Sequence, residues 1–231
     1  MKQKIPSKLN PKKRYLQIAL NSTLAQAAKI INHLPISDRI LLEAGTPLIK
    51  RYGEAGIRQI KLLYSQHLLA KGISPYIVAD LKMMDRGAVE VEIAARGGAD
   101  AAVALGHAPI ESLDALIAHC ENCGIDAMID MMNVEFPLSI LRKLKKQPAV
   151  VILHRGVDET EHNKQKMLPW YEIRRIKGSY DIMIAVAGGD TIKEIQSSIF
   201  NDADIVVVWK SFYQDSKDTV LLAEQFLATI K

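Results

Sequence analysis

The sequence predicts an α/β protein, a (β/α)8 TIM barrel forming a single domain, and three observations support that prediction. Eight short apolar runs recur along the 231 residues, segments of helical periodicity separate them, and no glycine-rich turn follows the first run. Strands buried on both faces give continuous apolar runs, and alternating strands and helices indicate a parallel sheet. Eight such units in this length favour a closed barrel. The alternative, a doubly wound open sheet, usually has the glycine-rich turn.

The predicted elements follow one another in a regular order. The strands are expected at 15–20, 39–45, 76–82, 101–106, 126–131, 149–154, 182–189 and 204–210. Between the early strands, apolar residues three or four positions apart predict amphipathic helices. Those helices are expected at 23–34, 55–69, 88–98 and 112–124.

Polar residues end the predicted strands, and in a (β/α)8 barrel the chemistry lies at the C-terminal ends of the strands. These end residues should therefore meet at one mouth. In chain order they are Asn21; Glu43; Asp80, Lys82 and Asp85; Gly106 and His107; Asp130 and Asn133; His154 and Arg155; Gly188 and Gly189; Trp209 and Lys210.

The third strand carries the densest group of charges. Asp80 and Lys82 are two residues apart and should face the barrel interior together, and Asp85 follows in the loop. An amine between carboxylates stays charged and can stabilise an anion or relay protons. The alternative is a structural ion pair, because short patterns of this kind are common.

Glu43 and Asp80 end adjacent predicted strands and could share one hard cation. Magnesium prefers oxygen ligands, commonly one or two carboxylates together with water and substrate oxygens. The alternative is that Glu43 simply pairs with Lys82. We expect a Mg²⁺ site at these two carboxylates.

The sequence "AVAGGD" ends the seventh strand just before a predicted helix. Gly188 and Gly189 would leave backbone N–H groups free to hold a phosphate, and barrels often bind phosphate after strands seven and eight. The alternative is a tight turn in which Asp190 or Thr191 caps the helix.

His154 ends the sixth strand, where it is either an acid or base near neutral pH or a structural histidine. A long polar segment follows it, "RGVDETEHNKQKMLP", and this length and polarity suit a lid over a site. His162, within that segment, is expected to be solvated.

The net charge of +4 is unevenly distributed along the chain. Residues 1–14 hold six basic residues and no acid, so the remaining chain, 15–231, is close to neutral. We expect a basic N-terminal tail at 1–14 that is solvated rather than bound to nucleic acid, because no aromatic residues lie among its lysines. The absence of a membrane-length apolar run and of a secretory signal predicts a cytoplasmic protein without membrane contact.

Several motifs together resemble the orotidine monophosphate decarboxylase superfamily and, within it, the 3-hexulose-6-phosphate synthases. They are "QIAL", "LLEAGTPLIK", "IVADLKMMDRGAVEVEIAARGGAD", "LGHA", "HRGVD" and "AVAGGD". The decarboxylase itself places a lysine where this chain has Glu43. The glutamate resembles the magnesium-dependent branch, which also includes the 3-keto-gulonate-6-phosphate decarboxylases.

The resemblance implies an aldol addition of formaldehyde to ribulose 5-phosphate through an enediolate. It implies Mg²⁺ on Glu43 and Asp80, proton transfer at C1 by His154, and electrostatic stabilisation by Lys82. It also implies a homodimer with shared active sites, in which Asp85 reaches into the partner's site. The residues expected to bind the sugar phosphate are Asn21, Gly106, Arg155, Gly188, Gly189 and Lys210.

Two positions depart from the family pattern. The first strand of the family ends in aspartate, whereas this chain has Asn21, which keeps a hydrogen-bonding oxygen but loses the charge. The family also has a glycine-containing turn after strand eight, whereas this chain has Trp209 and Lys210. These departures leave two alternatives open: a related lyase or decarboxylase on another sugar phosphate, or a non-catalytic homologue that binds a phosphorylated ligand.

Overall fold

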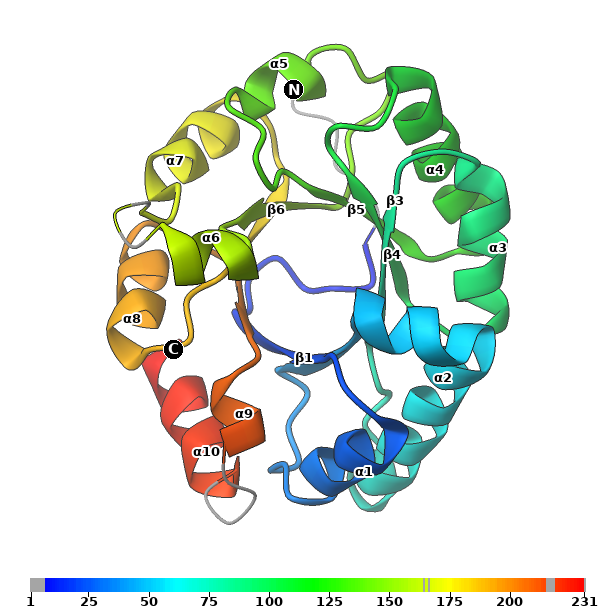
Figure 1. Ribbon diagram of the computed structural model, residues 1–231, viewed down its shortest axis with the longest axis vertical. Coiled ribbons are helices and arrows are strands. Elements are labelled where there is room, and N and C mark those ends of the chain that lie inside the picture. Colours follow the sequence, from blue (N-terminus) through cyan, green and yellow to red (C-terminus); the bar gives the residue numbers. More distant parts are fainter. Residues whose placement is uncertain (1–6, 164, 166, 215–218, 231) are drawn as a thin grey trace.

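Eight parallel strands close into a barrel in the computed structural model, which describes residues 7–230 except 164, 166 and 215–218. The strands pair in chain order, and β1 pairs with β8 to complete the ring (Figure 1). This confirms the predicted fold class. The strands are β1 (Tyr15–Leu20), β2 (Ile40–Ala44), β3 (Ile77–Met83), β4 (Ala101–Leu105), β5 (Asp126–Asp130), β6 (Val150–His154), β7 (Met183–Ala187) and β8 (Ile205–Val208).

Helices surround the barrel and connect successive strands (Figure 1). They are α1 (Leu24–Asn32), α2 (Thr46–Leu68), α3 (Gly87–Arg96), α4 (Ile110–Cys123), α5 (Pro137–Leu141), α6 (Val157–His162), α7 (Trp170–Ser179), α8 (Ile192–Phe200), α9 (Ser211–Gln214) and α10 (Thr219–Thr229), with a 3-10 turn η1 (Leu69–Lys71) after α2.

The second helix differs most from its prediction. It was expected at 55–69, but α2 begins at Thr46, directly after β2. Pro47 lies in its first turn, where a missing N–H is harmless, and the backbone leaves helical geometry at Gly53, whose φ is +59°. The helical period is visible only after that interruption, which is why the pattern revealed only the second half.

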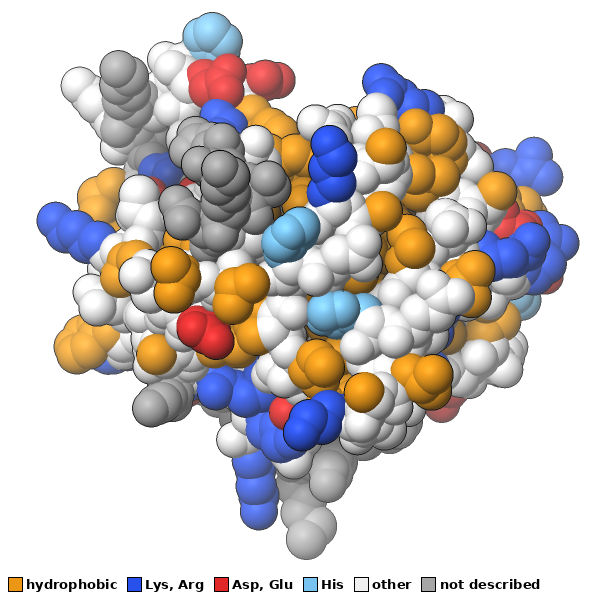
Figure 2. All heavy atoms as spheres, turned by 90° about the horizontal axis from the view of Figure 1, so that it is seen from below, with side chains coloured by type: hydrophobic (Ala, Val, Ile, Leu, Met, Phe, Trp, Pro, Cys, Tyr) orange, Lys and Arg blue, Asp and Glu red, His pale blue; other side chains and the backbone are white. Residues whose placement is uncertain are grey.

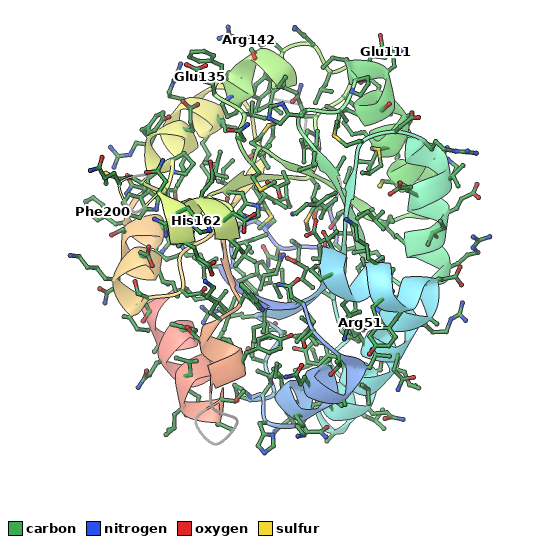
Figure 3. All side chains as sticks on the ribbon, viewed as in Figure 1. Arg51, Glu111, Glu135, Arg142, His162 and Phe200 are labelled. Carbon is green, nitrogen blue, oxygen red and sulfur yellow. The ribbon has the colours of Figure 1, made fainter. Side chains whose placement is uncertain are left out.

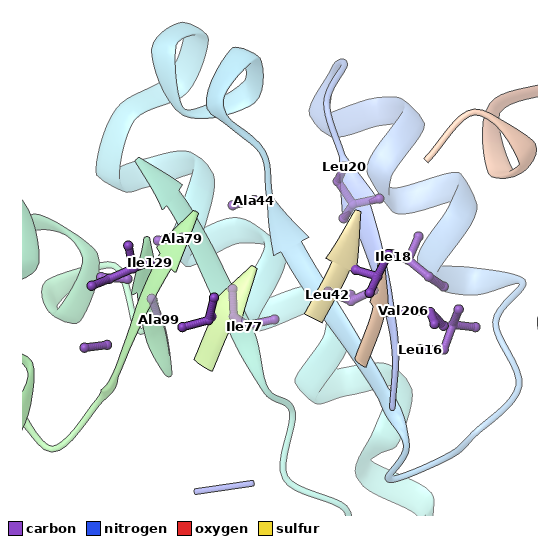
Figure 4. Packing of buried hydrophobic residues seen from close by; sticks show 14 of the residues in the cluster. Leu16, Ile18, Leu20, Leu42, Ala44, Ile77, Ala79, Ala99, Ile129 and Val206 are labelled. Atoms are coloured by element: carbon purple, nitrogen blue, oxygen red, sulfur yellow. The ribbon is translucent and has the colours of Figure 1, made fainter. Parts of the chain in front are cut away.

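Two apolar cores result from the alternation of side chains along each strand. On β1, Leu16, Ile18 and Leu20 face outward and pack with the helices, together with Leu42 and Ala44 of β2 (Figure 4). The intervening residues face the barrel axis and meet the inward residues of the other strands. The interior is therefore filled by side chains, and only the mouth is open for a ligand.

Residues 7–14 close the N-terminal end of the barrel. Leu9 is buried in the interior core, the Ser7 hydroxyl donates to Asp126 at 2.9 Å, and the Lys8 ammonium pairs with Asp100 at 2.9 Å. The expectation of a solvated tail is therefore wrong for Ser7, Lys8 and Leu9, which two buried carboxylates at the base hold in place. Residues 10–12 are exposed, as expected. Residues 1–6 of that expectation lie outside the described residues.

The surface carries mixed charges on the side of the molecule seen in Figure 2, where Lys and Arg side chains stand in separate groups among acidic and apolar ones. In the described part of the chain, no helix is long and apolar enough to cross a membrane.

Candidate active site

A cavity of about 440 Å³ opens at the C-terminal ends of the strands. Strand ends from β1, β2, β3, β5, β6, β7 and β8 line it, and α6 adds Val157 and Thr160 from the side. In Figure 1, α6 lies in front of the barrel strands. Eight of the residues predicted to form the site line this cavity: Asn21, Glu43, Asp80, Lys82, His154, Arg155, Gly188 and Lys210.

Asp130 is the centre of the charged network in this cavity. One of its oxygens accepts from the Lys82 ammonium at 3.0 Å and from His154 Nδ1 at 2.8 Å. Its other oxygen accepts from the backbone N–H of Met132 at 2.9 Å. Because Nδ1 is engaged by the carboxylate, Nε2 of His154 is the ring nitrogen left to exchange a proton with a ligand.

The network shifts the protonation of its members in opposite directions. Burial alone would raise the pKa of Asp130, but the adjacent His154 and Lys82 hold it at about 2. Burial lowers the pKa of His154, yet the attraction and hydrogen bond of Asp130 raise it overall. The pKa of Lys82 is also raised, against its burial, by Asp80 and Asp130. The site thus keeps the charged ammonium of Lys82 beside His154, whose pKa is higher than that of an ordinary histidine.

Lys82 reaches the network from an unusual backbone conformation. Its φ is +47°, in the left-handed region that side chains rarely adopt. The pairing of β3 with β4 shifts register between Ala79 and Met83, as in a β-bulge, and bulges near active sites re-aim side chains. The ammonium is held by Asp80 at 2.9 Å as well as by Asp130.

Glu43 is buried at the cavity floor beside Gln17. The Gln17 amide donates to Glu43 at 2.5 Å, while its own carbonyl oxygen is buried and has no hydrogen-bond partner. Burial and the charge of Asp80 raise the pKa of Glu43 to about 7. The Thr46 hydroxyl completes this side by donating to Asp80 at 2.9 Å.

Glu43 and Asp80 fit a hard cation by the chemistry of their donors. They supply only oxygen, and their mutual repulsion would be relieved by a divalent ion. No group of three or more His, Cys, Asp or Glu side chains is assembled as a metal site within the described ranges. Two carboxylates completed by water and substrate oxygens are nonetheless the arrangement that Mg²⁺ commonly uses.

Asn21 closes the cavity between β1 and β2. Its side-chain oxygen lies against Gly45, where a Cβ would stand only 1.8 Å away. Its backbone N–H donates to the hydroxyl of Tyr213, from the helix that follows β8, at 2.9 Å. The amide is therefore placed at the mouth with its backbone fixed, and Gly45 is the residue that makes room for it.

Arg155 and Gly188 form one side of the far end of the cavity. Gly188 has φ of +97°, and a Cβ there would stand 2.2 Å from the Arg155 carbonyl oxygen, so only glycine fits. The Arg155 guanidinium donates to the Gly188 carbonyl at 2.6 Å and to Glu194 at 2.9 Å. Arg155 therefore ties the end of β6 to the start of α8.

Asp190, Trp209 and Lys210 form the other side of the far end. The Asp190 carboxylate accepts from the Trp209 backbone N–H at 2.7 Å, and burial raises its pKa. The Lys210 ammonium lies 5.5 Å from the centre of the Trp209 ring. It also pairs with Glu161 of α6 at 2.6 Å, so α6 and the turn after β8 are linked across the cavity.

Six residues named from the sequence lie away from the cavity lining: Asp85, Gly106, His107, Asn133, His162 and Gly189. Asp85 is exposed in the loop before α3. A Cβ on Gly106 would meet Met131 of the β5 end, and Gly189 packs near Leu168. His162, labelled on α6 in Figure 3, is exposed, as expected.

Three charged or amide residues of the lining received no catalytic or binding role from the sequence. Asp130 was recognised only as a strand end, Gln17 lies inside an otherwise apolar run, and Asp190 was read only as a possible helix cap. Alternation could have indicated Gln17, because it is four positions before Asn21 and two before Ala19 on the inward face of β1. No local signal marks the pairing of Asp190 with Trp209, since the two residues follow different strands.

Comparisons with known proteins agree with this architecture. Residues 14–225 match the model of the orotidine 5'-phosphate decarboxylase / HUMPS family. The "Bifunctional enzyme Fae/Hps" of Methanosarcina barkeri is 38% identical over 220 residues, which cover 94% of this chain and 52% of the relative. The chain thus spans about half the length of the relatives it matches.

Solved structures show the same barrel. The 3-hexulose-6-phosphate synthase of Salmonella typhimurium has 25% identity and a TM-score of 0.81, covering 94% of this chain and 98% of the other. The 3-keto-L-gulonate-6-phosphate decarboxylase of Vibrio cholerae has 16% identity and a TM-score of 0.76, covering 95% and 100%. At its level of identity, the second likeness concerns the fold alone.

Proposed function

The chain belongs to the orotidine 5'-phosphate decarboxylase / HUMPS family, and we propose that it is a Mg²⁺-dependent aldehyde-lyase of the 3-hexulose-6-phosphate synthase type. It would add formaldehyde to ribulose 5-phosphate. The observation that carries the proposal is the Asp130 network, which joins a charged lysine and an oriented histidine beside two carboxylates. The names of the archaeal relatives and of the Salmonella enzyme support this reaction class.

The reaction needs one proton removed from C1 of ribulose 5-phosphate and one returned to the product. His154, in its neutral form, would accept the C1 proton at Nε2 while Asp130 holds Nδ1–H and stabilises the imidazolium. The electron pair left at C1 forms the new bond to the formaldehyde carbon, and the oxygen of formaldehyde takes up a proton. The sum is one C–C bond formed, with no net proton gained or lost.

The negative charge that develops on the sugar oxygens would be stabilised mainly by the charged groups of the floor. Lys82 is fixed by two carboxylates and points its ammonium into the cavity, so it needs no rearrangement to meet the charge. Glu43 and Asp80 would hold Mg²⁺, which supplies Lewis-acid stabilisation of the enediolate oxygens when it is bound. Gln17 would keep the Glu43 carboxylate in place.

The phosphate would bind at the far end of the cavity. Arg155 and Lys210 would supply the positive charge that attracts the phosphate. Gly188, which has no side chain, would let the phosphate approach the backbone closely. Asn21, at the mouth, would contact the sugar. Gly106 and Gly189 were expected to bind substrate as well, but the structure offers no contact of theirs with the cavity, and they do not enter the proposal.

A homodimer is part of the proposal. Asp85 lies exposed beside Met84, which is also exposed, in the loop that follows β3. An exposed carboxylate next to an apolar side chain at the mouth suits a subunit contact in which Asp85 reaches the partner's cavity. Two free cysteines, Cys120 and Cys123, suit the reducing cytoplasm that we propose as the location.

The gulonate-phosphate decarboxylase alternative is less supported. Arg155 directly after His154 is a small step toward the arginine-rich segment that those decarboxylases carry after the histidine, but its guanidinium is engaged by Glu194 and the Gly188 carbonyl. The names of the Methanosarcina barkeri relative and of the Salmonella enzyme also favour the synthase.

The decisive experiment follows formaldehyde consumption by the purified protein with ribulose 5-phosphate, first with Mg²⁺ and then with EDTA. Turnover that depends on Mg²⁺ supports the proposal. A folded protein that consumes no formaldehyde under either condition contradicts the synthase activity and favours a binding role.

A further inference from the structure

The backbone donors at the end of β8 are already occupied by a side chain of the protein. The Trp209 N–H donates to the Asp190 carboxylate at 2.7 Å, and the Ser211 hydroxyl donates to the Asp190 carbonyl at 2.9 Å. These turns follow strands seven and eight, the place where barrels of this class hold a phosphate with backbone N–H groups. A carboxylate of the protein therefore lies where the anionic end of a ligand would be expected.

Helix capping does not require Asp190. Thr191 is the N-cap of α8, where its side chain accepts from the Glu194 N–H at 3.2 Å, and the Glu194 carboxylate accepts from the Thr191 N–H at 3.3 Å. This capping box satisfies the start of the helix by itself. The side chain of Asp190 instead turns toward the neighbouring strand end and into the cavity lining.

The cations at this end are matched by carboxylates. Arg155 pairs with Glu194, and Lys210 pairs with Glu161. Counting Asp190, the described residues that make these contacts comprise three carboxylates and two cations. An incoming phosphate dianion would therefore meet a net negative charge among these residues, and like charges in contact oppose binding.

We propose that Asp190 is a specificity-determining residue whose carboxylate occupies the backbone donor of Trp209 and repels an anion there, and thereby weakens phosphate binding by this cavity. This inference rests on the proposed function for the ligand class. A phosphate must either displace the Asp190 carboxylate or bind through Arg155 and Lys210 alone. The chain would accordingly hold its sugar phosphate more loosely than a variant with an uncharged residue at this position.

Isothermal titration of the full-length protein with inorganic phosphate at pH 8 tests the inference. Asp190→Asn keeps the shape and can still accept from Trp209, but it removes the charge. We expect it to bind phosphate about tenfold more tightly than the wild type, or better. In steady-state assays the same variant should lower KM for ribulose 5-phosphate and leave kcat nearly unchanged.

Asp204→Asn is a matched control. Asp204 lies at the opposite end of β8, where its carboxylate also accepts a backbone N–H, that of Ile184 at 2.7 Å. The substitution changes the net charge equally, so it should leave the phosphate affinity at the wild-type value. If Asp204→Asn tightens phosphate binding as much as Asp190→Asn does, the effect is one of total charge and the inference is overturned.

A second variant guards against a folding defect. Asp190→Gly removes the carboxylate and frees the Trp209 N–H, so it should also bind phosphate more tightly. If neither variant at this position binds more tightly than the wild type, the inference is overturned. Formaldehyde consumption by the wild type tests the proposed function separately, so a failure of one does not imply a failure of the other.

Discussion

The two ends of the barrel both contain buried carboxylates beside lysines, but they use them differently. At the base, Asp100 and Asp126 are bound by hydrogen-bond donors of the protein on both oxygens. At the mouth, Glu43 accepts from the Gln17 amide on one oxygen, and the amide oxygen of Gln17 is buried without a partner. The same residue types therefore serve structure at one end and are left available for a ligand at the other.

At the base, the protein itself supplies all the hydrogen-bond donors that the buried carboxylate of Asp126 needs. Asp126 accepts from the Tyr76 hydroxyl at 2.6 Å, from Ser7 at 2.9 Å and from the Lys8 N–H at 3.2 Å. These donors come from the N-terminal segment and from the residue before β3. The carboxylates thus join the N-terminal segment to the barrel, and no ligand is needed to complete them.

Two groups at the mouth, Glu43 and Gln17, lower the stability of the folded protein. Burial and Asp80 raise the pKa of Glu43 to about 7, which means that its ionised form is destabilised in the folded protein. Gln17 leaves a buried acceptor unpaired, which costs about 1–3 kcal/mol. Unfavourable groups of this kind mark a candidate site for a ligand.

The comparison predicts the largest effect for Asp130→Asn. The substitution removes the charge that orients His154 and fixes Lys82, so kcat for formaldehyde consumption should fall by about 10³-fold, within the range for lost acid–base catalysis. The barrel should still fold, as circular dichroism would show. A loss of less than tenfold would place the proton transfer elsewhere.

Glu43→Gln should change the stability of the protein and its affinity for Mg²⁺ in opposite directions. The affinity for Mg²⁺, measured by calorimetry, should fall by at least about 10–100-fold. The metal-free variant should nevertheless be more stable than the wild type by about 1–3 kcal/mol at pH 8. That gain has a defined pH dependence: the raised pKa of Glu43 destabilises the fold fully above about pH 7 and not at all below its ordinary value of 4.5.

Denaturant titrations of both proteins at pH 5 and pH 8 measure that difference. The gain should shrink at the lower pH. Equal stability differences at the two pH values would mean that the ionised form of Glu43 does not destabilise the folded protein.

At the base, Asp126→Ala should have the opposite outcome. It leaves the Tyr76 hydroxyl and the Lys8 N–H without their acceptor and should lower the free energy of unfolding by about 1–3 kcal/mol. Turnover per folded molecule should equal that of the wild type, because the base lies at the far end of the strands. Urea denaturation and the formaldehyde assay together measure both quantities. A drop in kcat would show that the two ends are coupled.

The smallest effect is expected for Glu161→Gln. Its ion pair with Lys210 is half exposed, and pairs exposed to solvent contribute little to stability. Releasing Lys210 should therefore lower KM for ribulose 5-phosphate by no more than about fivefold. Thr160→Ser, in the same helix, is a suitable control that keeps the hydroxyl. An increase in KM would mean that the pair helps to close α6 over the substrate.

The sequence predicted the barrel well because its strands are buried on both faces. Continuous apolar runs located all eight strands to within about two residues at each end. The rule that strand ends converge then brought Glu43, Asp80, Lys82 and His154 together correctly. The prediction of the helices was less complete, because the interruption at Gly53 hid the helical period of the first part of α2.

The features of the site and the base that the sequence did not predict depend on contacts between distant parts of the chain. Asp130 was visible as a strand end, but its role required knowing that Lys82 and His154 both reach it. Asp190 and Trp209 are 19 residues apart, and no periodicity links them. The docking of Ser7 and Lys8 under the barrel likewise depends on carboxylates more than ninety residues away.

Lys82 has a consequence for how this protein could be altered. A lysine with φ of +47° is held in a conformation that glycine adopts without cost. Replacing it with glycine would relax the backbone while deleting the ammonium. The relaxed backbone would not offset that loss, because Asp80 and Asp130 would then be buried without the cation that pairs with both of them.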